Sequence, residues 1–111
     1  MELIWITGGA WQGKTDYARS NYGEEWEIRP HYEQTVRRQL LEGKDPMEEA
    51  RKLLEGEGKL VLIGDEIGCG IVPADPFERA YREANGRVAC FLAGEAKQGI
   101  RVVCGIGSRL K

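Results

Sequence analysis

Two short apolar runs, residues 3–7 and residues 60–63, are hydrophobic at nearly every position. A strand that is buried on both faces has this pattern, so each run predicts a central strand of a parallel sheet. Residues 100–106 predict a further strand. Residues 24–28 alternate between polar and apolar side chains and are followed by Pro30, which predicts a short edge strand.

Four segments between and after these runs predict helices: residues 14–21, 31–41, 45–55 and 75–92. Two of them begin with the same signal, because Asp45 and Asp75 each precede a proline and stand three residues before a glutamate. An aspartate caps the free N–H groups of the first turn, and proline fits the first helical position. Strands that alternate with helices predict an α/β fold with a parallel sheet.

The turn after the first strand carries the strongest motif of the chain. Residues 8–15 read Gly-Gly-Ala-Trp-Gln-Gly-Lys-Thr and fit G-x-x-x-x-G-K-[S/T], the phosphate-binding P-loop pattern. The two fixed glycines let backbone N–H groups turn toward a phosphate, and the lysine brings a cation to the β- and γ-phosphates. The threonine hydroxyl is placed to bind Mg²⁺. We therefore expect a nucleoside triphosphate at Gly8, Gly9, Ala10, Trp11, Gln12, Gly13, Lys14 and Thr15.

An acidic pair follows the second apolar run. Asp65 and Glu66 stand just past residues 60–63, which is the Walker B arrangement. The carboxyl ends of parallel strands meet at one edge of the sheet, so we expect this pair beside the P-loop. Asp65 is a candidate Mg²⁺ ligand and Glu66 a candidate catalytic group, with an ordinary acidic loop as the alternative. The fold class predicted is α/β, a P-loop NTPase-like parallel sheet of about four strands with flanking helices in three layers.

Composition narrows the classes of function. The chain has 111 residues, which predicts a single domain over residues 1–111. A net charge of −2, without a basic stripe, argues against nucleic-acid binding. No apolar run reaches membrane-spanning length, and the N-terminus lacks a signal-peptide pattern. Cys69, Cys90 and Cys104 are widely spaced, so we expect reduced thiols in a cytoplasmic protein.

Three segments of the second half are similar to one known family. They are residues 66–73 (Glu-Ile-Gly-Cys-Gly-Ile-Val-Pro), residues 86–88 (Gly-Arg-Val) and residues 102–107 (Val-Val-Cys-Gly-Ile-Gly), with a basic tail ending in Lys111. Together with Thr-Gly-Gly-Ala at residues 7–10, they resemble the adenosylcobinamide kinase/adenosylcobinamide-phosphate guanylyltransferases of cobalamin biosynthesis. The resemblance covers residues 3–15 and about 64–111, and its E-x-G-x-G-I-V-P segment is specific to that family.

The resemblance implies a bifunctional enzyme and makes a homo-oligomer the expectation. Such enzymes phosphorylate the aminopropanol hydroxyl of adenosylcobinamide with GTP or ATP, and then transfer GMP from GTP to that phosphate through a guanylylated histidine. By position, the catalytic candidates are Lys14, Glu66 and His31, which is the single histidine of the chain. Family members are longer between the first helix and Leu60, the region that supplies their histidine.

His31 has a second interpretation as a half-exposed residue at the start of a helix. A nucleophilic histidine needs a group to orient it, and Glu33 is the carboxylate that the sequence offers. Arg37 and Arg38 face either a phosphate or solvent. Two other functions stay open at this point: a P-loop kinase or NTPase acting on another small molecule, and a non-catalytic GTP-binding module.

Overall fold

The computed structural model describes residues 1–68 and 72–111 of the chain. Along the sequence its elements are β1 (Glu2–Gly8), α1 (Lys14–Asn21), β2 (Glu27–Arg29), α2 (Tyr32–Leu41), α3 (Pro46–Leu54), β3 (Lys59–Asp65), α4 (Pro76–Glu95), β4 (Gln98–Val103) and β5 (Ile106–Arg109). The family-like segment 66–73 therefore lies partly outside the described residues.

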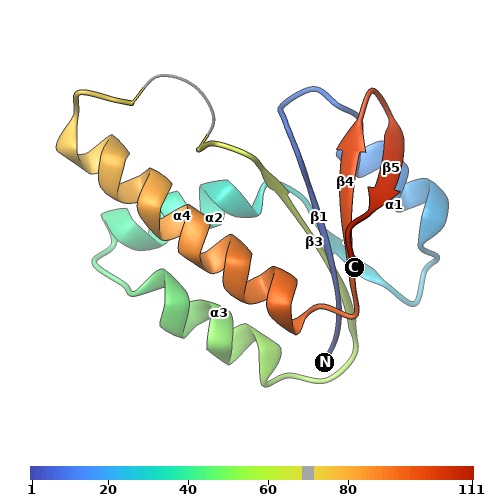
Figure 1. The fold of residues 1–111 in the computed structure, drawn as a ribbon. Helices are drawn as coiled ribbons and strands as arrows, with labels where there is room; N and C mark the ends of the chain where they lie inside the picture. The colour runs from blue at the N-terminus through green and yellow to red at the C-terminus, as the bar shows by residue number, and fades with distance from the viewer. Residues whose placement is uncertain (69–71) are drawn as a thin grey trace.

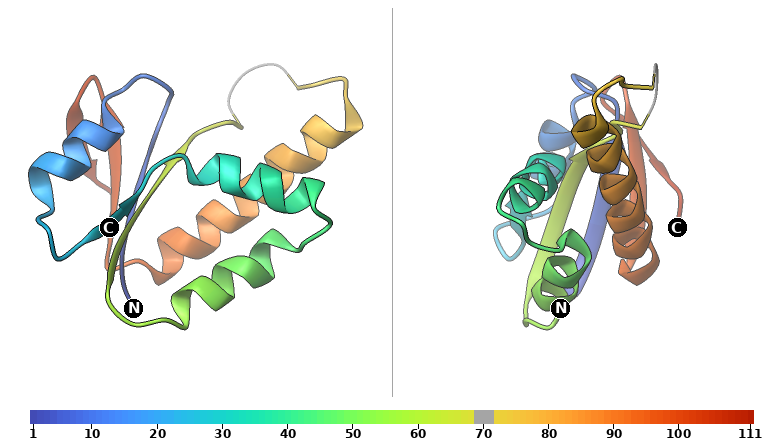
Figure 2. Two further views of the ribbon diagram at one scale, coloured as in Figure 1. Left: turned by 180° about the vertical axis from the view of Figure 1, so that it is seen from behind. Right: turned by 90° about the vertical axis from the view of Figure 1, so that its left-hand side faces the viewer.

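The strands form one five-stranded sheet in the order β2-β3-β1-β4-β5. Strands β2, β3, β1 and β4 are parallel to one another, and β5 alone is antiparallel. Helices α2, α3 and α4 cover one face, whereas α1 lies on the other face (Figure 1). The views of Figure 2 show the same grouping from behind and from the side. The predicted three-layer α/β fold is confirmed.

The central strands contribute side chains to both faces because they are buried on both sides. On the face of α2, α3 and α4, the buried cluster takes residues from β1, β3 and all three helices: Leu3, Trp5, Tyr32, Val36, Ala50, Leu60, Leu62, Tyr81, Val88, Leu92 and Ala96. On the face of α1, the buried cluster is smaller: Ile4, Ile6, Ala18, Val61, Ile63, Ile100 and Val102. The continuous apolar runs of the sequence correspond to this two-sided burial.

The predicted strand 100–106 is wrong at its C-terminal end. The chain turns at Cys104 and Gly105, whose φ angles are 51° and 76°, and returns as β5. Positive φ at both residues of a two-residue loop is the geometry of a type I′ hairpin turn, which a glycine at the second position favours. Val103 and Ile106 pair directly across this turn. The sheet therefore has five strands instead of about four, and its last strand is antiparallel.

The helix starts are as the sequence predicts. The carboxylate of Asp45 accepts a hydrogen bond from the Met47 N–H, and that of Asp75 accepts one from the Phe77 N–H. A proline occupies the first turn of both helices. Within the part of the chain that the structure describes, no helix has the length and apolar character to cross a membrane.

We expect Leu62→Ala to lower the free energy of unfolding by about 2–5 kcal/mol, because it opens a cavity in the core. The Leu62 side chain of β3 is fully buried in the cluster beneath α2, α3 and α4. The matched control is Leu41→Ala at the end of α2, where 67% of the residue is exposed, and its cost should stay below about 1 kcal/mol. Urea denaturation measures both values, and equal losses would show that the core is assigned wrongly.

Candidate functional site

The P-loop and the acidic pair meet because β1 and β3 pair in parallel. Gly8, the last residue of β1, is the register partner of Asp65, the last residue of β3. The Glu66 N–H donates to the Gly8 carbonyl oxygen at 2.9 Å, which extends this pairing beyond the strands. On the other side of β1, a Cβ at Gly8 would lie 2.5 Å from the Val102 carbonyl oxygen, so only glycine fits there.

Lys14 is directed back into the loop. It is 7% exposed, and its ammonium donates to the Gly9 carbonyl oxygen at 2.6 Å and pairs with Asp65 Oδ1 at 2.7 Å. Gly13 precedes α1 with a φ of 83°, and the fully exposed Trp11 forms the tip of the loop with a φ of 62°. The predicted contact between the P-loop and the aspartate after the second apolar run is therefore present as an ion pair.

A cavity of about 590 Å³ lies over the loop. Its lining includes residues 10–15 of the P-loop together with His31, Gln34, Ile63 and Asp65. The structure thus brings together most of the predicted nucleotide-binding residues, the candidate nucleophile and the candidate metal ligand. Thr15 and Asp65 share this lining, and their hydroxyl and carboxylate oxygens are the ligands that Mg²⁺ prefers, so the residues fit a nucleotide-bound Mg²⁺.

Glu66 lies apart from this cavity. Thr7 of β1 is the register partner of both Gly64 and Arg101, and Glu66 stands two residues beyond Gly64. Because alternate side chains of a strand point to opposite faces, Glu66 and Arg101 share the face opposite to Asp65. Arg101 Nε donates to Glu66 Oε1 at 3.0 Å, and a terminal guanidinium nitrogen donates to Oε2 at 3.2 Å. This bidentate pair was not predicted from the sequence.

His31 and Glu33 reach the site from the end of β2. Glu33 is a buried carboxylate, and its Oε1 accepts a hydrogen bond from the Asp65 N–H at 2.8 Å. His31 Nδ1 lies 3.8 Å from Glu33 Oε2, so the carboxylate predicted to orient the histidine is beside it. His31 itself is 59% exposed, which agrees with the alternative interpretation of this residue as well. The carbonyl of Glu33 accepts the Tyr81 hydroxyl at 2.8 Å.

The two arginines that follow His31 do not face the cavity. Arg37 pairs with Glu78 at 2.7 Å and stacks on Tyr81, while Arg38 pairs loosely with Glu42. Their role in phosphate binding, left open by the sequence, is therefore not supported by their position.

The β4–β5 turn holds the P-loop from the other side. The Cys104 N–H donates to the Gln12 side-chain oxygen at 2.7 Å, and the Gly105 N–H donates to the Gln12 carbonyl oxygen at 2.8 Å. Cys104 is a free thiol, as is Cys90, whereas Cys69 lies outside the described residues. The sequence predicted neither this turn nor its contact with Gln12, which is far from it along the chain.

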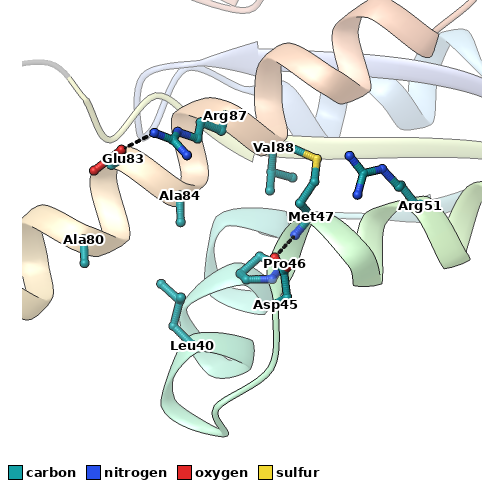
Figure 3. Close-up of a pocket in the computed structure, with 10 residues that line it drawn as sticks. All are labelled: Leu40, Asp45, Pro46, Met47, Arg51, Ala80, Glu83, Ala84, Arg87 and Val88. Atoms are coloured by element: carbon teal, nitrogen blue, oxygen red, sulfur yellow. Dashed lines mark hydrogen bonds and ion pairs between the residues drawn. The ribbon is translucent and has the colours of Figure 1, made fainter.

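A second cavity, of about 630 Å³, lies between α4 and the connection of α2 to α3 (Figure 3). Arg51 and Arg87 are its cationic residues, and they are already paired with Glu48 and Glu83. None of the residues predicted to bind nucleotide or metal lines it. The candidate site is therefore the cavity over the P-loop.

We expect Gln12→Met to weaken nucleotide binding about three- to tenfold, because it removes the hydrogen bond that fixes the P-loop to Cys104. The matched control is Gln98→Met at the opposite end of β4, where the Gln98 side chain accepts a bond from the Tyr22 hydroxyl. Equilibrium binding of labelled GTP and ATP measures both variants. Equal affinities for the two variants would contradict a bracing role for Gln12.

The sequence is similar to a known protein family and to two of its relatives. A family model described as cobinamide kinase / cobinamide phosphate guanyltransferase matches residues 33–110. Two relatives, each described as a bifunctional adenosylcobalamin biosynthesis protein, come from Escherichia coli strain K12 and Salmonella typhimurium strain LT2. Each is 43% identical over 53 residues, a segment that covers 48% of this chain and 29% of the relative. Since the family model covers more than half of the sequence, the chain belongs to the cobinamide kinase / cobinamide phosphate guanyltransferase family.

Proposed function

We propose that this protein catalyses nucleotide-dependent phosphorylation of a cobinamide-type corrinoid. The observation that carries the proposal is the P-loop cavity, in which Lys14 and Asp65 stand in contact at 2.7 Å beside Thr15. The family supplies the acceptor, because its description names cobinamide and because the two relatives are described as adenosylcobalamin biosynthesis proteins.

Phosphoryl transfer requires positioning and neutralisation of charge more than covalent chemistry by the protein. The P-loop N–H groups and Lys14 would bind the β- and γ-phosphates, and the ion pair with Asp65 holds the lysine in place until the nucleotide arrives. When Mg²⁺ is bound by Thr15 and Asp65, it supplies further positive charge at the phosphates. The acceptor hydroxyl would then attack the γ-phosphorus and give its proton to Glu66, while the bond from the γ-phosphorus to the bridging β-phosphate oxygen breaks and the nucleoside diphosphate leaves.

We propose Glu66 as the catalytic carboxylate beside the acceptor hydroxyl. Its carboxylate is held by Arg101 on the face opposite to Lys14, so it would serve an acceptor that approaches over the end of β1. A corrinoid is a large macrocycle, and a second copy of the chain is the proposed source of the rest of its pocket. The reaction as a whole fits a cytoplasmic enzyme.

We expect Lys14→Met to lower the rate of phosphorylation on the order of a hundredfold or more, because it removes the cation that stabilises the transferred phosphoryl group. The matched control is Lys52→Met on α3, where 67% of the lysine side chain is exposed and its partner Glu49 is at the limit of an ion pair. Transfer of label from the γ-phosphate of GTP or ATP to adenosylcobinamide measures the rate. Full activity in Lys14→Met would refute the proposed site, and nucleotide binding without any transfer by the unaltered protein would favour a binding module instead.

GMP transfer is a second candidate function, favoured by the position of His31 on the same cavity as the P-loop with Glu33 next to its Nδ1. In this reaction His31 Nε2 would attack the α-phosphorus of GTP and pyrophosphate would leave. The phosphate of the corrinoid would then displace the histidine.

If His31 carries GMP, then incubation with GTP labelled at the α-phosphate should give an acid-labile labelled band on denaturing electrophoresis. His31→Ala should abolish this band without abolishing γ-phosphate transfer, because the kinase site does not need an imidazole. Gln34→Ala serves as the control, since Gln34 lines the same cavity but has no nucleophilic nitrogen. If the protein gives no labelled band but still transfers the γ-phosphate, it is a kinase without GMP-transfer activity.

A further inference from the structure

Three potential metal-binding side chains, two from the start of α2 and one from the end of β3, meet on the α2 side of the cavity. His31 precedes α2, Glu33 lies in its first turn and Asp65 ends β3, and one potential ligand atom from each lies within 4.8 Å of the others. We propose that His31, Glu33 and Asp65 bind a divalent first-row transition-metal ion, such as Mn²⁺ or Zn²⁺, in the absence of nucleotide. This proposal does not rest on the proposed function.

The burial of Glu33 is the first argument. Its side chain is 5% exposed, and a carboxylate is seldom buried without strong partners. One oxygen accepts the Asp65 N–H, but the other lies 3.8 Å from His31 Nδ1, which is beyond hydrogen-bonding distance. The 3.8 Å between this second oxygen and the histidine nitrogen is a separation that two ligands of one ion can have.

The balance of charge is the second argument. Glu33 and Asp65 offer carboxylate oxygens within 4.8 Å of each other, and among the residues that the structure describes Lys14 is the cation paired with Asp65. Like charges at this distance repel, and the excess negative charge sits beside a partly enclosed cavity. A divalent cation would offset that charge. The same negative charge affects the neighbouring Tyr81. Burial is the larger cause and the charge of Glu33 the second, and they raise the pKa of the Tyr81 hydroxyl to about 12.

The donor set selects the class of ion. One imidazole nitrogen and two carboxylate oxygens suit Mn²⁺ or Zn²⁺ better than Mg²⁺, which prefers oxygen ligands alone. Two ligands that each stand about 2.1 Å from a metal are separated by at most about 4.2 Å. Two atoms at the observed limit of 4.8 Å would therefore have to approach each other by about 0.6 Å or more before both could bind one ion. A rotation of the His31 side chain, which is 59% exposed, would bring its nitrogen closer to the carboxylates.

The site shares Asp65 with the proposed Mg²⁺ site of the nucleotide, but its other two ligands are different. It lies toward α2 and uses neither the P-loop backbone nor Thr15, which stands in α1. Lys14 contacts Oδ1 of Asp65, so the other oxygen of that carboxylate is the candidate ligand. A metal on Nδ1 of His31 leaves the proton on Nε2, which removes the lone pair that attack on a nucleotide requires. Because Asp65 belongs to both sites, the ion would bind the nucleotide-free protein, and its binding excludes simultaneous GMP transfer through His31.

The test uses the untagged protein, freed of metal by a chelator and titrated with Mn²⁺ and with Zn²⁺ without nucleotide. Calorimetry should show one ion per chain, and X-ray absorption of the zinc complex should show one nitrogen ligand. His31→Asn should bind at least about tenfold more weakly, because it removes the imidazole ligand. Glu33→Gln should do the same by removing the buried negative charge.

The matched control is Glu57→Gln, an exposed carboxylate at the other end of β3, which should bind metal as the unaltered protein does. Because His31 is mostly exposed, His31→Asn remains informative even if Glu33→Gln does not fold. No ion taken up by the unaltered protein, or equal affinity in His31→Asn, would overturn the proposal. Kinase activity can persist in either case, so the two proposals fail separately.

Discussion

The in-register parallel pairing of β1 with β3 is the constraint on which the site depends. It sets Gly8 opposite Asp65, and so the start of the P-loop lies beside the carboxylate that pairs with Lys14. A shift of one residue in this register would turn Asp65 to the opposite face, because alternate side chains of a strand point to opposite sides. β2 then pairs with the outer edge of β3 and delivers His31 and Glu33 to the same end of the sheet.

The same end of the sheet is reinforced from its other side by the β4–β5 hairpin. The backbone N–H groups of its turn bind Gln12, and the Val102 carbonyl oxygen approaches Gly8 closely. A loop that must present N–H groups to a phosphate loses less conformational entropy on binding when neighbouring elements already hold it. The hairpin thus contributes to the site without supplying a residue that lines its cavity.

The two residues of the acidic pair have different surroundings, although they are adjacent in the sequence. Asp65 contacts Lys14 at the cavity, whereas Glu66 is held by Arg101 on the opposite face. The Walker B pattern predicts both carboxylates beside the P-loop, where the Asp65 carboxylate pairs with Lys14 and the Glu66 carboxylate pairs with Arg101 instead. The pattern cannot predict the ion pair of Glu66, because Arg101 comes from a strand that is separated from Glu66 by β1.

The α/β fold, the central strands, the helix starts and the P-loop motif can be predicted from the sequence, because local patterns of hydrophobicity, caps and glycines encode them. The pattern of residues 100–106 predicts one strand instead of the β4–β5 hairpin, since a two-residue turn inside an apolar segment leaves little local signal. Three features become visible only in the folded chain: the burial of Glu33, the hydrogen bond between Gln12 and the β4–β5 turn, and the separation of the Asp65 and Glu66 side chains. These features arise from contacts between strands that are neighbours in the sheet but distant in the chain, and no local pattern specifies which side chains such contacts bring together.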